Sequence, residues 1–217
     1  MKQLKKISVT TYIAIFLTLL GILARGVRLG SVPGGINMDE AFGAYEGYSL
    51  LHYGVDSWGY PFPVYLETWG SGMSALNTYL IIPFMALLGK NIVAVRMPSF
   101  ILACVSLYAA YSLVKRLFDE RAALIALLYM AVCPYHYMLS RWSIDCNLAP
   151  GLILIAFLFM LKGGERAHYY ILSAVFFGLS LYAYITVIPF VFGLLLLSVI
   201  YLIWVRRIAS WKSIAVA

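Results

Sequence analysis

Long apolar segments separated by short polar ones dominate the pattern along the chain. A helix rises about 1.5 Å per residue, so roughly 17–25 apolar residues span a bilayer core of about 30 Å. Six segments approach or exceed that length, and we expect each to form a transmembrane helix. They are residues 7–29, 93–114, 122–139, 147–161, 168–185 and 187–205. The pattern predicts an all-α membrane protein with both ends in the cytoplasm.

One further apolar segment, residues 74–88, contains Asn77 and Pro83. As a helix it would reach only about 22 Å. The basic residues decide its placement, because cytoplasmic loops of membrane proteins are enriched in Lys and Arg. If the segment lies at the outer interface, eleven of the 16 basic residues fall inside, whereas only six do if it crosses. We therefore expect it to lie at the interface.

This topology gives a single transmembrane module over residues 1–217, with an outer loop at residues 30–92. Residues 41–52 of the loop read as a helix. Its aromatic side chains suit the headgroup region of a bilayer, so we expect juxtamembrane helices in the loop.

Composition agrees with a membrane protein, since 63% of the residues are hydrophobic and only 12% are charged. Soluble domains carry about 25% charged residues. The net charge of +7 does not indicate a nucleic-acid partner, because the basic residues form short clusters between apolar segments. The three cysteines have no metal-binding spacing.

Acidic residues gather on the predicted outer side, and Asp39 and Glu40 are the first of them. At the start of a helix such residues cap free amides and are favoured by the helix dipole. Alternatively, a carboxylate in a partly dehydrated cleft at the bilayer surface has a raised proton affinity and serves as a general base. The sequence leaves both interpretations open.

Four other charged residues have a similar choice of roles. Glu67 is either a solvated loop acid or, with Asp39, a ligand of a divalent cation. Arg141 and Asp145 lie four residues apart, where they can pair with each other or act at the membrane boundary. Arg96 either extends to the headgroups or binds a phosphate through its guanidinium fork.

Taken in order, these features resemble the C-type (GT-C) membrane glycosyltransferases, in the branch of the protein O-mannosyltransferases and the aminoarabinose transferase of lipid A. The resemblance runs from about residue 1 to residue 184. It rests on Asn37-Met38-Asp39-Glu40-Ala41, Glu67, Val95-Arg96-Met97-Pro98-Ser99 and Arg141-x-x-x-Asp145.

The resemblance implies transfer of a sugar from a polyprenyl phosphate on the non-cytoplasmic side. It implies catalytic roles for Asp39 and Asp145, and matches Glu67 to the family's loop acid. The family often has a proline pair after that acid, whereas this chain has Thr68-Trp69-Gly70. It also implies that substrate is bound by Glu40, Glu67, Arg96 and Arg141. Members usually have about twice as many spans, so we expect the N-terminal part of a larger fold.

The sequence thus predicts a cell-envelope glycosyltransferase of the bacterial cytoplasmic membrane, with its active site on the outer face. Its partners would be a polyprenyl-phosphate sugar lipid and a lipid or protein acceptor, and a divalent cation is the candidate cofactor. The alternative is a non-catalytic membrane subunit or a lipid-carrier translocation partner. A carrier would need polar groups near the midplane, whereas the charges here lie at the outer rim.

Overall fold

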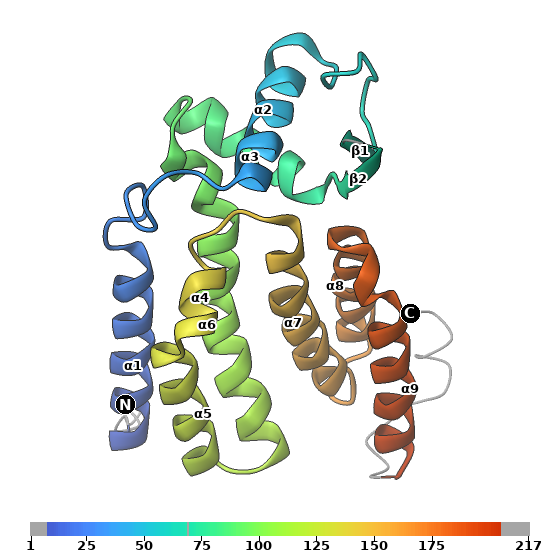
Figure 1. Cartoon of the computed structure of the whole chain (residues 1–217). Coiled ribbons are helices and arrows are strands. Elements are labelled where there is room, and N and C mark those ends of the chain that lie inside the picture. The colour runs from blue at the N-terminus through green and yellow to red at the C-terminus, as the bar shows by residue number, and fades with distance from the viewer. Residues whose placement is uncertain (1–7, 69, 205–217) are drawn as a thin grey trace, which may run out of the picture.

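The structure is a computed structural model that describes residues 8–68 and 70–204. Its main body is a row of helices that run side by side in Figure 1. The terminal basic residues used to predict the topology lie outside the described residues. The helices of this row are α1 (Val9–Gly26), α4 (Ile92–Leu117), α5 (Glu120–Val132), α7 (Leu148–Gly163), α8 (His168–Ala183) and α9 (Ile188–Trp204).

Four helical segments of the described chain are long and apolar enough to cross a membrane. The all-α membrane class is therefore confirmed. Helix α8 is apolar but has only 16 residues, so the count of six spans stays a prediction. The four segments are Val9–Gly26, Ile92–Leu117, Asp145–Gly163 and Ile185–Trp204.

The predicted span at residues 122–139 is not one continuous helix. Helix α5 ends at Val132, and α6 (Pro134–Leu139) begins directly after Cys133. Proline lacks a backbone N–H and is best tolerated in the first turn of a helix, which is where Pro134 lies. The break therefore falls where the sequence removes a helical hydrogen bond, and α6 lies above α5 in Figure 1.

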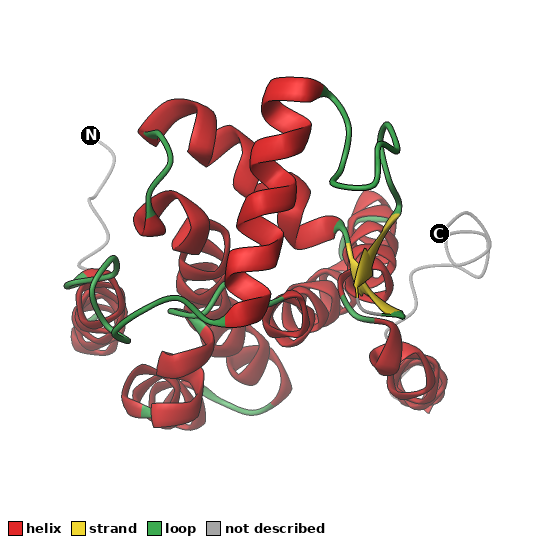
Figure 2. Ribbon diagram, turned by 45° about the horizontal axis from the view of Figure 1, so that its top comes forward, coloured by secondary structure: helices red, strands yellow, loops and turns green. Residues whose placement is uncertain are grey.

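Two helices lie over the upper end of this row rather than within it. Helices α2 (Met38–Tyr53) and α3 (Leu76–Leu88) cross the top of the molecule in Figures 1 and 2. A two-stranded antiparallel hairpin, β1 (Tyr65–Thr68) and β2 (Ser71–Ser74), joins them. The predicted helix at residues 41–52 is thus part of a longer α2, whereas the hairpin was not predicted.

Helix α3 packs between α2 and α4. Its contacts attach the upper layer, which consists of α2, α3 and the hairpin, to the row of helices below. Buried Ile81 and Met85 of α3 contact buried Val95 of α4, and Tyr48 of α2 covers them. The turn between α4 and α5 and the turn between α7 and α8 lie at the opposite, lower end in Figure 1. Asp119, Glu120 and Glu165 belong to these lower turns, so they are separated from the acids of the upper layer.

Candidate functional site: an acidic cavity

A cavity of about 730 Å³ lies at the upper end of the molecule, between α2, the hairpin and the segment that leads into α7. Three carboxylates line it, those of Asp39, Glu67 and Asp145. The sequence predicts these three and Glu40 as candidate acids; the fold brings the three together from segments far apart in the chain, whereas Glu40 does not line the cavity. The remaining lining residues are Met38, Phe42, Ser57, Trp58, Thr68, Gly72, Met73, Ile144, Cys146 and Tyr184.

The Asp39 carboxylate has no capping role in the described structure. Helix α2 is capped by Asn37, whose side chain accepts a hydrogen bond from the Asp39 amide at 2.9 Å. Glu40 completes a capping box by accepting from the Asn37 amide at 3.1 Å. Among the described residues, nothing donates a hydrogen bond to the half-buried Asp39 carboxylate, which therefore stays available to a ligand in the cavity.

Asp145 is more tightly held than Asp39 and is only 6% exposed. It begins the short 3-10 helix η1 (Asp145–Asn147), and its carboxylate accepts from the Cys146 amide at 2.7 Å and the Ser74 amide at 3.4 Å. No ion pair in the described part of the chain joins it to Arg141. An ion pair with Arg141, which the sequence left open as one role of these residues, therefore does not hold Asp145 in place.

Glu40 joins the segments that carry the two aspartates. It is fully buried, and its Oε1 accepts from the Ser143 amide at 2.9 Å and from Arg96 Nε at 3.0 Å. Asn77 of α3 reinforces the contact by donating to the Ser143 carbonyl at 2.8 Å. Since Glu40 follows Asp39 directly and Ser143 precedes Asp145 by two residues, this network sets the distance between the two cavity acids.

Arg96 donates its hydrogen bonds to other protein atoms, and its side chain does not line the acidic cavity. Its Nε and Nη2 donate to Glu40 at 3.0 and 3.2 Å, and its Nη groups also donate to the carbonyls of Leu29, Pro33 and Gly35. A guanidinium has five N–H groups, so every donor of this fully buried side chain is used. The geometry therefore gives no support to the expected phosphate-binding role of Arg96.

Arg141 is likewise fully buried and directed at the backbone. Its Nε donates to the Val32 carbonyl at 2.8 Å, and its Nη2 donates to the Val27 carbonyl at 2.7 Å. Its Nη1 contacts the carbonyls of Ala24 and Arg25 and the Tyr137 hydroxyl. Both arginines thus anchor the loop between α1 and α2, and neither lines the acidic cavity.

Several lining residues were not predicted, and Ser57 and Trp58 are the clearest. Buried Glu46 of α2 accepts hydrogen bonds from the Ser57 amide, at 2.9 Å, and from its hydroxyl. Asp56 accepts from the Trp58 amide at 3.0 Å. The only signal in the sequence was the concentration of acidic, glycine and aromatic residues in this loop, which does not indicate which side chains face inward.

A comparison with models of known protein families gives a match. The model of the family described as dolichyl-phosphate-mannose-protein mannosyltransferase matches residues 74–217, which is about two-thirds of the chain. The chain belongs to this family. The match includes Asp145, Arg96 and Arg141, whereas Asp39 and Glu67 precede it. Comparisons with curated proteins and with solved structures gave no match.

Membership supports a glycosyltransferase that uses a polyprenyl-phosphate sugar donor, and it confirms the resemblance inferred from the motifs. An integral membrane location follows from the same match together with the apolar helices. The segments that carry the cavity acids lie at the upper end of the helices in Figure 1.

Two of the carboxylates that line the cavity could bind a divalent cation. Asp39 and Glu67 present hard oxygen ligands to the same space. The described residues hold no group of three His, Cys, Asp or Glu side chains arranged to bind a metal. Mg²⁺ is commonly held by one or two carboxylates together with substrate phosphates. The residues present therefore suit a cation that arrives with a phosphate ligand better than a cation bound by protein alone.

Proposed function

We propose that the acidic cavity is the site at which a sugar is transferred from a polyprenyl phosphate to an acceptor hydroxyl. The observation that carries the proposal is the convergence of Asp39, Glu67 and Asp145 on one cavity at the end of the bundle. The donor class comes from the family match.

Asp39 is the proposed general base. Its carboxylate is half-buried, faces the cavity and accepts no hydrogen bond from the described residues, so it can take a proton from an acceptor hydroxyl. In the transfer, the bond between the sugar C1 and the phosphate oxygen breaks, and a bond from C1 to the acceptor oxygen forms. The acceptor proton passes to Asp39, and the electron pair of the broken bond stays on the phosphate.

The leaving phosphate needs stabilisation by a group other than the two arginines. Among the described residues, no Lys or Arg lines the cavity. The polar groups that do line it include Thr68, whose hydroxyl can donate a hydrogen bond to a phosphate oxygen. A divalent cation held by Asp39 and Glu67 would supply Lewis-acid stabilisation of the developing charge when bound.

Asp145 is the second proposed catalytic residue. Its two amide contacts hold one carboxylate in a fixed orientation at the cavity wall. Such a group can orient the sugar or the acceptor through hydrogen bonds, and precise placement of reacting groups contributes strongly to rate. We further propose that this end of the bundle faces the outside of the bacterial cytoplasmic membrane, where a lipid or protein acceptor would be available.

Transfer of labelled mannose from a polyprenyl-phosphate carrier tests the proposal in reconstituted vesicles. We expect Asp145→Asn to lower turnover by about 10²-fold or more while the chain stays folded. Asp119→Asn is the matched control, because Asp119 caps α5 at the other end of the molecule and asparagine caps equally well. Wild-type turnover by Asp145→Asn would contradict the assignment. Movement of the labelled carrier across the bilayer without transfer would instead support the carrier function.

A further inference from the structure

A second cavity, of about 320 Å³, lies on a different side of α2 from the acidic one. Ala41, Ala44, Tyr45 and Tyr48 of α2 line it, whereas Asp39 and Phe42 of the same helix line the acidic cavity. The opposite wall comes from the end of α3 and the start of α4. In the described part of the chain the two cavities share no lining residue, so the second one is a separate feature of the upper layer.

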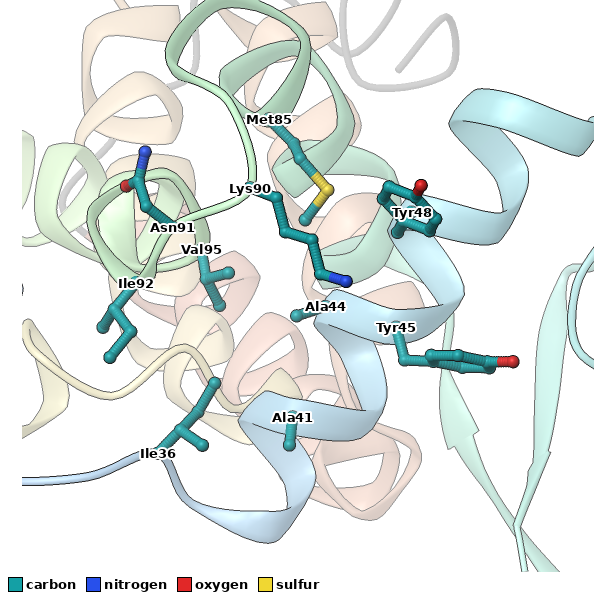
Figure 3. A pocket seen from close by; sticks show the side chains of 10 residues that line it. All are labelled: Ile36, Ala41, Ala44, Tyr45, Tyr48, Met85, Lys90, Asn91, Ile92 and Val95. Carbon is teal, nitrogen blue, oxygen red and sulfur yellow. The ribbon is translucent and has the colours of Figure 1, made fainter.

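Most side chains that line this cavity are apolar, and the polar ones are those of Tyr45, Tyr48, Lys90 and Asn91. Figure 3 shows Met85 and Val95 facing the space from one side and Ala41 and Ala44 from the other. Lys90 extends into the space from the turn between α3 and α4, toward Tyr48. Its Nζ lies 4.7 Å from the centre of the Tyr48 ring. A cation over an aromatic face gains modest stabilisation and keeps its charge accessible.

Among the residues that the structure describes, Lys90 is the one charged residue that lines this cavity. None of the ion pairs in the described part of the chain includes it, and its side chain is exposed. A positive group at the edge of an apolar space is complementary to a ligand with an anionic head and an apolar tail. The neighbouring Tyr45 is 61% exposed, as is typical of residues at a membrane interface.

We propose that this cavity binds an anionic diacyl phospholipid of the surrounding bilayer. Its phosphate lies at Lys90, and the first carbons of its chains lie against Ile36, Ile92 and the ring of Tyr45, the more exposed apolar groups of the lining. The site lies at the end of the bundle that carries α2 and α3, so a bilayer lipid reaches it without leaving the membrane surface. Basic pockets beside transmembrane helices recognise anionic headgroups through the same combination of charge and apolar contact.

A phospholipid fits this cavity better than the sugar donor does. The donor must present its sugar to Asp39 and Asp145, which line the other cavity. Of the residues described in the structure, none that lines the space beside Lys90 carries a carboxylate that could act on a sugar. Bilayer phospholipid is also present in large excess over any carrier lipid, so mass action favours its binding.

Native mass spectrometry of the protein, extracted from nanodiscs of equal phosphatidylglycerol and phosphatidylcholine, tests the proposal. We expect the wild type to retain phosphatidylglycerol preferentially, by about five-fold, the factor that corresponds to about 1 kcal/mol for one Lys at an anionic surface. Lys90→Gln should abolish this preference. Ala41→Leu, which fills the cavity, should lower retention of both lipids.

Lys162→Gln is the matched control, because Lys162 also lies near aromatic rings, at 5.8 Å from Phe159 and 5.7 Å from Tyr169, but outside this cavity. It should leave the preference unchanged. Equal retention of the two lipids by the wild type, or an unchanged preference in Lys90→Gln, would overturn the proposal. So would displacement of the lipid by equimolar polyprenyl phosphate or by millimolar inorganic phosphate.

The proposal is independent of the transfer function, because its readout is lipid retention. Asp39→Asn should retain phosphatidylglycerol as the wild type does, even if sugar transfer is lost. Loss of lipid preference in Asp39→Asn would mean that the two cavities are one site, which would also overturn the proposal.

Discussion

Glu40→Gln removes one charge from the buried network that joins the two cavity acids. The Glu40 carboxylate accepts four hydrogen bonds, two from Arg96 and one each from the Asn37 and Ser143 amides. Glutamine has the same shape but only one acceptor oxygen. In either orientation of the glutamine amide, the NH₂ group would face two donors, so two hydrogen bonds are lost. The Arg96 guanidinium also loses its counter-charge.

The expected cost is large because both partners of the ion pair are fully buried. Removing one partner of a buried ion pair costs about 3–5 kcal/mol, since the remaining charge is left without compensation in a low dielectric. For a chain of this size that corresponds to a fall in melting temperature on the order of 10 °C. Activity should fall as well, because a shift of about 1 Å between reacting groups can cost about 10²-fold in rate.

Thermal unfolding in detergent and steady-state transfer would be measured together. We expect Glu40→Gln to lower both the melting temperature and kcat, and to change the donor KM much less, because Glu40 does not line the cavity. The double variant Glu40→Leu/Arg96→Met removes both charges, so its stability loss should be smaller than the sum of the two single losses. Glu120→Gln, in an exposed ion pair, is the control. A Glu40→Gln protein with wild-type melting temperature would refute the reasoning.

Two further predictions concern topology and the cation. In a chain without native cysteines, a cysteine at Phe62, which is 81% exposed, should react with an impermeant reagent from outside. A cysteine at Phe118, 74% exposed at the opposite end, should react only after permeabilisation, and the reverse pattern would show that the chain is inverted. Chelation by EDTA should abolish sugar transfer, and Mg²⁺ or Mn²⁺ should restore it. Full activity in EDTA would exclude the cation proposed at Asp39 and Glu67.

The helical class could be predicted from the sequence because apolar length is a local property. Residues 93–114 and 147–161 appear in the structure within α4 and α7, with ends that differ by a few residues. The β-hairpin could not be predicted in this way, because it depends on the pairing of Tyr65 with Ser74 and of Thr68 with Ser71. That short polar stretch shows no apolar alternation from which a strand pair could be recognised.

The sequence could identify the charged residues of this region but could not show which of them face the cavity. Asp39 lines the cavity, whereas Glu40, the next residue, is fully buried and bonded to Arg96 and to the Ser143 amide. The donors of Arg96 and Arg141 are used by carbonyls more than sixty residues away, in the loop after α1. Only the fold reveals those acceptors, and with them the contacts by which both arginines anchor the loop between α1 and α2.

Turnover by purified Asp39→Asn protein tests the central claim most directly. The assay measures transfer of labelled sugar from a polyprenyl-phosphate donor in reconstituted vesicles, alongside donor binding. The substitution keeps the size of the side chain and removes its charge, and the cap of α2 remains because Asn37 and Glu40 form it. We predict turnover reduced by about 10²-fold or more, with expression, folding and donor binding retained. Near-normal turnover by Asp39→Asn would contradict the assignment of the acidic cavity as the transfer site.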